Sequence, residues 1–330
     1  MTRFLARLAA GFVAIAALCG AAEAAPSGTI TVYTSQPSDQ MDLVVKAFNK
    51  NYPDVKVEVF RSGTTEVMSK LQAEFAAGSS PADVILIADA VAITQLKNDN
   101  RLLAYPDAPA KGVPDALIDP EKMFYGTKLI TTGIVYNTKL VSTPPKSWND
   151  LLAPDVASKT IMPSPLYSGA AVIHLGTMVQ QPQFGWKYYE TLAANGAVAG
   201  QGNGTVIDAV ARGEKAYGII IEYMAMNAKK KGSPVDFVFP IEGVSAISQP
   251  VAVLKTSDNP EAAKAFVDWQ LSKEAQQQSV SQGYFPIFSE VAPPSGYPSI
   301  DSLKILPMDA AATLKDDAAN KKKFADLFGG

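Results

Sequence analysis

The chain has 330 residues, of which 47% are hydrophobic and 18% are charged, a composition typical of a folded protein large enough for two domains. Its 29 basic and 32 acidic side chains give a formal net charge of −3, which argues against a nucleic-acid-binding protein because such proteins usually carry a surplus of positive charge. After the first 24 residues, no stretch is apolar over the length that a membrane-spanning helix requires.

The first 24 residues have the organisation of a secretory signal peptide. Two arginines precede an apolar stretch at residues 8–20, and Ala22-Glu23-Ala24 then fits the small-residue pattern of a cleavage site. We therefore expect cleavage after Ala24 and an exported mature chain. Attachment of a lipid at Cys19, the only cysteine, is the less favoured alternative, because Leu18 is bulkier than the small residue expected before a lipidated cysteine.

Helices and strands alternate along the rest of the chain. A helix is expected from Ser38, where apolar residues recur on one face, and a strand at residues 55–60, where valines alternate with charged residues. Further strands are expected at residues 83–87, 133–136, 197–199, 216–221, 235–239 and 249–254. Further helices are expected at residues 65–77, 90–98, 169–180, 185–194, 205–212 and 260–276. This alternation predicts α/β layers with largely parallel sheets.

The sequence offers few groups for catalysis or for binding a metal. After loss of Cys19, the mature chain has no disulfide and no cysteine nucleophile. His174, the only histidine, lies in an apolar helical run and is expected to pack in the interior. Tyr188 and Tyr189 are adjacent on a predicted helix, where their side chains diverge by about 100°, so packing is favoured over a shared metal. We expect no cofactor and no enzymatic activity, with a secreted phosphoesterase as a remote alternative.

The first candidate binding segment consists of Ser62, Gly63, Thr64 and Thr65. It follows the strand at residues 55–60 and opens a helix, and ligands of open α/β sheets bind beyond the carboxyl ends of the strands. Hydroxyl groups and free backbone N–H groups at a helix N-terminus can hold an anion. The alternative is ordinary N-capping, for which serine and threonine are the usual residues.

A second segment of the same kind begins at Ser168. Two prolines stiffen the approach to it, and Gly169 and Ala170 then open a helix without bulky side chains. An oxyanion could therefore approach the backbone N–H groups closely. Capping of the helix by Ser168 is again the alternative.

Two further segments place polar side chains after strands. Asn203 and Gly204 lie in a glycine-rich stretch that is not a dinucleotide fingerprint, because Thr205 stands where the pattern G-x-G-x-x-G requires its last glycine. Glu222 and Tyr223 follow an apolar strand. They could accept hydrogen bonds from a hydroxyl or amine of a ligand, or they could cap and pack the next helix.

Six motifs in a fixed order give the chain a resemblance to a known family. They lie at residues 30–35, 80–90, 132–137, 250–254, 259–266 and 283–286. The chain resembles the periplasmic solute-binding proteins of bacterial ABC importers, in the group that contains ferric-ion, phosphonate and sugar-phosphate binders. Each motif alone is weak, but their order behind a signal peptide makes the resemblance strong.

This resemblance implies an α/β, two-lobed type II periplasmic binding protein fold with a ligand cleft between lobes that crossover strands join. The first lobe would comprise residues 25–129 and about 245–290, and the second residues 130–244. Residues 291–330 would form C-terminal helices, which we assign to neither lobe. The implied function is to capture a small solute and deliver it to the membrane permease. We expect a monomer with no nucleic-acid partner.

Matching positions favour an anionic solute over ferric iron. Ferric-ion members of the family bring two adjacent tyrosines to the site, whereas the matching residues here are Glu222, Tyr223 and Met224. The position that can hold a histidine in those members falls near Ser35. Because ferric iron prefers several anionic oxygen ligands, a ferric-ion-binding protein is the alternative and not the first choice.

The anion-binding half of the family pattern is better matched. Ser168, Gly169 and Ala170, together with Asn203, resemble the residues with which relatives hold an oxyanion, and residues 62–65 would close on it from the other lobe. We therefore expect a phosphonate or a phosphorylated organic solute, whose hydroxyl or amine end Asp89, Glu222 and Tyr223 would contact. Binding would depend on neutral donors and helix dipoles, without an arginine clamp.

Overall fold

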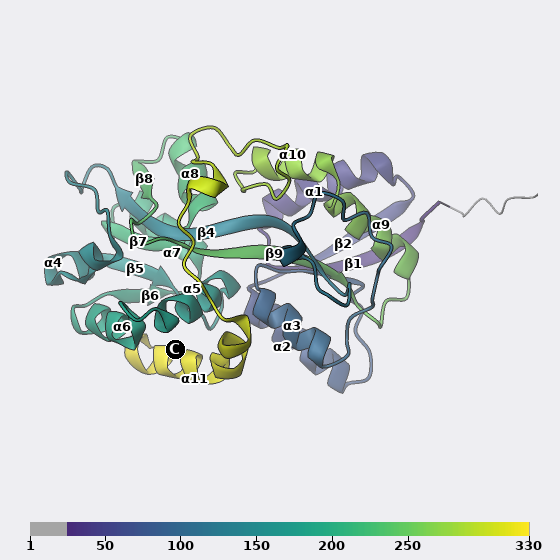
Figure 1. Ribbon diagram of the computed structural model, residues 1–330, viewed down its shortest axis with the longest axis horizontal. Coiled ribbons are helices and arrows are strands. Elements are labelled where there is room, and N and C mark those ends of the chain that lie inside the picture. Colours follow the sequence, from purple (N-terminus) through teal and green to yellow (C-terminus); the bar gives the residue numbers. More distant parts are fainter. Residues whose placement is uncertain (1–24, 330) are drawn as a thin grey trace, which may run out of the picture.

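One mixed sheet runs through the molecule (Figure 1), as the computed structural model of residues 25–329 describes it. The expected signal peptide, its cleavage after Ala24, and Cys19 lie outside these described residues. The strands are β1 (Gly28–Thr34), β2 (Val55–Arg61), β3 (Val84–Leu86), β4 (Tyr125–Asn137), β5 (Thr160–Pro163), β6 (Val198–Gly200), β7 (Tyr217–Ile221), β8 (Val235–Val238) and β9 (Ser245–Val253).

Helices cover the sheet and alternate with most of its strands. They are α1 (Ser38–Asn51), α2 (Thr64–Ala76), α3 (Ala90–Asn98), α4 (Pro154–Ala157), α5 (Gly169–Gln180), α6 (Gly185–Ala194), α7 (Asn203–Ala211), α8 (Glu222–Lys230), α9 (Pro260–Gln270), α10 (Lys273–Ser281) and α11 (Ala310–Phe328). Among the described residues, three short 3-10 helices lie at Asp115–Leu117, Trp148–Leu152 and Ile300–Ser302. Within residues 25–329, no helix is both long enough and apolar enough to cross a membrane.

The strand order β2-β1-β3-β9-β4-β7-β5-β6 divides the sheet into two lobes joined by two long strands. The first lobe is built around β1, β2 and β3, and the second around β5, β6 and β7; within each of these groups the pairs are parallel. β4 and β9 pair antiparallel with each other and reach both groups (Figure 1). The expectation of largely parallel sheets is therefore wrong at the centre, where every pair that β4 or β9 makes is antiparallel.

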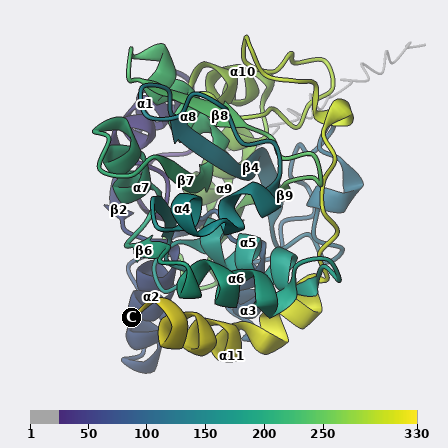
Figure 2. The ribbon, with the colours of Figure 1, turned by 90° about the vertical axis from the view of Figure 1, so that its left-hand side faces the viewer.

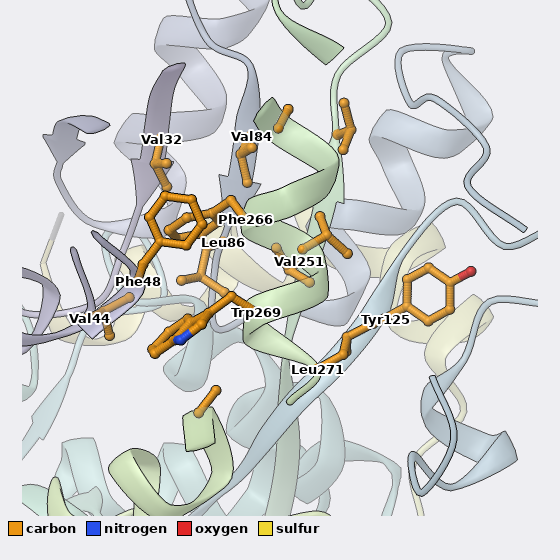
Figure 3. Packing of buried hydrophobic residues seen from close by; sticks show 14 of the residues in the cluster. Val32, Val44, Phe48, Val84, Leu86, Tyr125, Val251, Phe266, Trp269 and Leu271 are labelled. Atoms are coloured by element: carbon orange, nitrogen blue, oxygen red, sulfur yellow. The ribbon is translucent and has the colours of Figure 1, made fainter. Parts of the chain in front are cut away.

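Apolar patterning decides which helices cover the first lobe. Met41, Val44 and Phe48 recur on one face of α1 and are buried. The ring of Phe48 packs edge-on against Phe266, with the ring centroids 5.2 Å apart, and also faces Trp269 (Figure 3). Helices from the start and the end of this lobe thus share one core, although more than 200 residues separate them in the chain.

The expected helix at residues 260–276 is two helices, α9 and α10. The chain leaves the helical conformation after α9, and the hydroxyl of Ser272 accepts a hydrogen bond from the backbone N–H of Ala275 at 3.1 Å. Ser272 is therefore the N-cap of a new helix, a role for which serine is well suited. Apolar periodicity continues through this break, which is why the pattern alone predicted one helix.

The last described residues form a single long helix that contacts both lobes. α11 packs against α5 and α6 of the second lobe and also against α3 of the first (Figure 2). The side chain of Thr313 contacts Gly176 so closely that a Cβ at Gly176 would lie 2.5 Å from it. The residue boundaries expected for the two lobes remain predictions.

Replacement of Phe48 by alanine tests the shared core of the first lobe. Because Phe48 is fully buried against two aromatic rings, we expect Phe48→Ala to lower the free energy of unfolding by about 3–5 kcal/mol, measured by urea denaturation. Leu43→Ala in the same helix is the control, since that side chain is 51% exposed and its loss should change stability by about 0.5 kcal/mol or less. Equal losses in the two variants would contradict this packing.

Candidate functional site

A cavity of about 370 Å³ lies between the two lobes, beyond the carboxyl ends of their strands. The first lobe contributes residues that follow β1, β2 and β3, and the second lobe contributes residues that follow β5, β6 and β7. This is the position in which open α/β sheets bind ligands. The cavity is therefore the candidate binding site.

Five helices begin at the cavity wall. The wall includes residues from the first turns or N-caps of α1, α2, α5, α7 and α8. The first N–H groups of a helix have no partner within the helix and carry the positive end of its dipole, so each of these ends favours a negative charge. Their convergence makes the cavity suitable for an anion.

Charged side chains are almost absent from the cavity wall. Of the residues that line it, Arg61 alone has a charged side chain, and no aspartate, glutamate or histidine lines it. The guanidinium of Arg61, the last residue of β2, donates to the Tyr167 hydroxyl at 3.2 Å and to the Ser35 carbonyl oxygen at 3.5 Å. Arg61 thus reaches the wall from the residue just before the predicted segment 62–65, and binding without an arginine clamp remains a prediction.

The structure places nine of the thirteen predicted site residues at the cavity wall. These nine are Ser35, Gly63, Thr64, Ser168, Gly169, Ala170, Asn203, Gly204 and Tyr223. The other four, Ser62, Thr65, Asp89 and Glu222, do not line it and have partners within the protein. The role of all thirteen in binding a ligand remains a prediction.

Ser168 and Asn203 are linked to each other at the wall. The Ser168 hydroxyl accepts from the backbone N–H of Ala171 at 3.3 Å and so caps α5, and it also accepts from the Asn203 amide at 3.1 Å. The amide oxygen of Asn203 accepts from the backbone N–H of Ile221. Capping and cavity lining are therefore combined in Ser168, and Asn203 ties the ends of two strands to α5.

The two lobes touch each other beside the cavity. The backbone N–H of Thr65 donates to the Tyr167 carbonyl oxygen at 3.4 Å, and its hydroxyl donates to the Pro165 carbonyl oxygen at 3.4 Å. A Cβ on Gly169 would lie 2.7 Å from the Thr64 hydroxyl and 2.8 Å from the Ala88 carbonyl oxygen. Glycine at this position thus lets α5 approach the first lobe, and the lobes are in a closed arrangement.

One hydroxyl at the wall has no hydrogen-bond partner within the described chain. Thr64 is buried at the start of α2, and its side-chain oxygen makes no hydrogen bond among residues 25–329. A buried polar group without a partner is costly unless something else satisfies it. The Thr64 hydroxyl therefore keeps unused hydrogen-bonding capacity at the start of α2.

The two predicted acidic residues are buried for structural reasons. Asp89 is the N-cap of α3 and accepts from the backbone N–H groups of Val91 and Ala92, both at 2.9 Å. Burial raises its pKa to about 7. Glu222 is fully buried, accepts from the backbone N–H of Thr131 at 2.5 Å, and leaves its second oxygen without a partner within the described chain.

Glu222 connects α8 to the crossover strand β4 and not to the cavity. Its contacts to Thr131 come from both the backbone and the hydroxyl of that residue. Burial raises the pKa of the Glu222 carboxyl to about 8, because the charged form is not solvated by water at this position. Glu222 and Tyr223 were predicted to contact the ligand together. Adjacent residues at a helix start point in different directions, so that only Tyr223 lines the cavity.

Sequence reasoning missed several wall residues. Tyr167, Gln36, Gln249 and Tyr284 line the cavity together with Arg61. Arg61 and Gln36 directly adjoin predicted positions, and Tyr284 lies in the loop at residues 283–286 that resembles the family. Gln249 belongs to the long strand β9, and no local pattern marks it as facing a ligand.

Other groups with chemical potential lie away from the cavity. His174 is buried in α5, with Nδ1 3.0 Å from the Ser245 hydroxyl, and burial lowers its pKa to about 3. Tyr188 and Tyr189 are both buried in the core of the second lobe. The packing expected for these three residues is confirmed. Among the described residues, no group of three histidine, cysteine, aspartate or glutamate side chains could hold a metal ion.

Comparison with known proteins identifies the family. The sequence pattern of the family described as "Bacterial extracellular solute-binding protein" matches residues 34–277. The chain belongs to this family, which confirms the resemblance seen in the sequence. Its family and its fold are those of solute-binding proteins, which are not enzymes.

Individual relatives agree on the class but differ in what they bind. A probable ABC transporter periplasmic-binding protein of Sinorhizobium fredii is 25% identical over 80% of this chain and 75% of its own length. The Fe(3+)-binding periplasmic protein of Serratia marcescens is 27% identical over 93% of this chain and 91% of its own. The structure of periplasmic binding protein AfuA from Actinobacillus pleuropneumoniae, with exogenous fructose-6-phosphate bound, matches with a TM-score of 0.83 and 24% identity, covering 92% of this chain and 99% of that one. The fold is thus the expected two-lobed type II fold.

Replacement of Glu222 by glutamine tests its protonation. Burial raises the pKa of Glu222 in the folded protein, so between about pH 4.5 and pH 8 the folded state holds a proton that the unfolded chain has lost. The free energy of unfolding of the wild type should therefore fall as the pH rises through this range. We expect the stability of Glu222→Gln relative to wild type to increase by at least about 1.4 kcal/mol between pH 5 and pH 8.5, measured by urea unfolding. Exposed Glu214→Gln is the control. A difference that does not change with pH would contradict a buried neutral carboxyl.

Proposed function

We propose that this protein captures a small anionic organic solute, a phosphonate or a phosphorylated compound, in the periplasm. It delivers this solute to the membrane permease of an ABC importer and does not alter it chemically. The observation that carries the proposal is the composition of the cavity wall, in which five helix N-termini and one arginine converge without any carboxylate. Such a wall favours a negative charge and has nothing to neutralise a cation.

The size of the cavity supports a small organic molecule. Its volume of about 370 Å³ is near the lower end of the range in which proteins bind small ligands. A phosphoryl or phosphonyl group offers several acceptor oxygens, which match the donors at the starts of α2, α5 and α7. The neutral polar side chains Gln201 and Gln249 remain for hydroxyl groups of the solute.

The contacts between the lobes support a capture mechanism by closure. An occupant that touches α2 on one lobe and α5 or α7 on the other makes all its contacts only when the lobes are closed. Thr65 and Tyr167 then meet beside it, as they do in this structure. The permease would receive the closed, loaded form.

Ferric iron is the alternative occupant, favoured by one relative and by two phenols. The Serratia marcescens protein is named for Fe(3+) binding. The ring centroids of Tyr223 and Tyr284 lie 4.2 Å apart, and both residues line the cavity. Burial raises the pKa of both hydroxyls, which opposes the phenolate form that iron requires. The wall also lacks the carboxylate or imidazole that would complete a ligand set, so an anion is the better proposal.

A thermal-shift panel tests the ligand class. The panel contains inorganic phosphate, 2-aminoethylphosphonate, fructose-6-phosphate, citrate, ferric nitrilotriacetate and spermidine. We expect stabilisation by a phosphonate or phosphate ester and none by spermidine; a solute at about 100 times its Kd adds about 2.7 kcal/mol to the stability of the folded state. Stabilisation by the ferric salt alone, with a coloured complex, would replace this proposal with the iron alternative.

Replacement of Gly169 by alanine tests closure around the solute. The added Cβ would meet Thr64 and the Ala88 backbone of the opposite lobe, so we expect the affinity for the solute that binds most tightly in the panel to fall at least about tenfold, or about 1.4 kcal/mol, in calorimetry. Leu43→Ala is the control, because Leu43 is exposed on α1 and does not line the cavity. Unchanged affinity in Gly169→Ala would show that binding does not require this approach of the lobes.

A further inference from the structure

Lys128 is a buried lysine that lies directly behind the cavity wall. It belongs to the crossover strand β4, and only 1% of it is exposed. Its ammonium nitrogen donates to the Gln36 side-chain oxygen at 3.0 Å and lies 4.5 Å from the centre of the Tyr284 ring. The Gln249 amide lies 3.5 Å from the same Gln36 oxygen. Gln36, Gln249 and Tyr284 all line the cavity, so one layer of side chains separates this charge from an occupant.

No acidic side chain compensates the charge of Lys128 within the described chain. The ion pairs formed among residues 25–329 do not include it. An ammonium group has three donors, and Gln36 is its single hydrogen-bond acceptor here. Burial of a charge with so little compensation is costly, so its presence in a folded protein calls for a reason.

The elements packed around Lys128 bring few titratable groups. The loop after α10 brings Tyr284, whose ring faces the ammonium, and α8 brings Tyr223 against that ring. Glu222 of α8 and Asp39 of α1 lie near enough to raise the pKa of the Tyr284 hydroxyl. On Lys128 itself, burial acts alone and lowers its pKa to about 7. Lys128 therefore changes from the ammonium form to the neutral amine near pH 7.

We propose that Lys128 is a specificity-determining residue of the cavity, which selects a doubly negative occupant and keeps its own proton when that occupant binds. With Arg61 at the wall and Lys128 behind it, two positive charges face a cavity whose wall contains no carboxylate. The complement to this pair is a dianion such as an ionised phosphate ester or phosphonate. This inference rests on the proposed function and narrows its substrate class.

Lys128 acts on the occupant through its charge, across the layer of side chains that contains Gln36. Because the ammonium fixes the oxygen of the Gln36 amide, the amide nitrogen is turned away from Lys128 and donates to Gln282. A negative charge in the cavity would favour the ammonium form, whereas a neutral amine would keep only a weaker, uncharged hydrogen bond to the Gln36 oxygen. Binding of a dianion is therefore coupled to proton uptake wherever the unliganded amine is partly neutral.

The first experiment measures the affinity for fructose-6-phosphate by calorimetry at pH 7.5 and pH 9.5. The phosphate ester is fully ionised at both values, because its second pKa is about 6. In wild type we expect the affinity to fall at least about tenfold between these values, as Lys128 loses its proton. In Lys128→Met we expect an affinity at least about tenfold weaker at pH 7.5 and a smaller dependence on pH, which then reports on Glu222. Lys56→Met, at an exposed position, is the control.

The second experiment measures the melting temperature of the unliganded protein at pH 6.5. If the charge of Lys128 serves an occupant and not the fold, Lys128→Met should melt at least about 2 °C higher than wild type. Lys128→Gln should show the same reduced pH dependence of binding as Lys128→Met. Because the two replacements differ in shape and polarity and share only the loss of the charge, this agreement would assign the effect to the charge. A lower melting temperature in Lys128→Met, or an unchanged affinity for a phosphate ester that binds wild type, would overturn the inference.

The two proposals can fail separately. If no phosphate or phosphonate of the panel binds the wild-type protein, the proposed function fails, and the melting temperature of Lys128→Met still decides whether the buried charge serves the fold. If the wild type binds a phosphate ester and Lys128→Met binds it equally well, only the role of Lys128 is lost.

Discussion

The convergence of helix N-termini from both lobes on one cavity is the constraint on which the rest of this structure depends. In each lobe parallel strands end at the same edge of the sheet, and the next helix starts there with N–H groups that have no partner within the helix. Placing these edges face to face gives a locally positive environment in a protein whose net charge is −3. Net charge and site charge are thus independent in this molecule.

Close approach of the lobes requires small residues where their helices meet. Gly63 and Gly169 occupy such places, since a Cβ on Gly63 would lie 2.6 Å from the Tyr167 carbonyl oxygen and one on Gly169 would contact Thr64. Conformational freedom is not the reason, because neither residue has a positive φ. The requirement is steric, and it exists only in the closed arrangement.

The crossover strand β4 carries buried polar groups on both sides of the junction between the lobes. Lys128 reaches toward the cavity wall, and Thr131 holds Glu222 of α8. Both ionisable groups have pKa values shifted toward the neutral form by burial. A strand with such residues is less stable than an apolar one would be, which is consistent with selection for binding at the expense of stability.

Local patterns in the sequence determined most of the element types and nine of the residues at the cavity wall. Alternating valines indicated β2, and the bounds of α3, α5 and α6 were predicted to the residue, because apolar periodicity and capping act within a few neighbours. The segments at Ser62–Thr65 and Ser168–Ala170 were found because strand ends and helix starts are themselves local features. Only the tertiary structure decided that Arg61 reaches the wall, that Glu222 turns to β4, and that Lys128 lies behind Gln36. Each of these depends on contacts between residues far apart in the chain, and side-chain direction across such contacts leaves no trace in a local pattern.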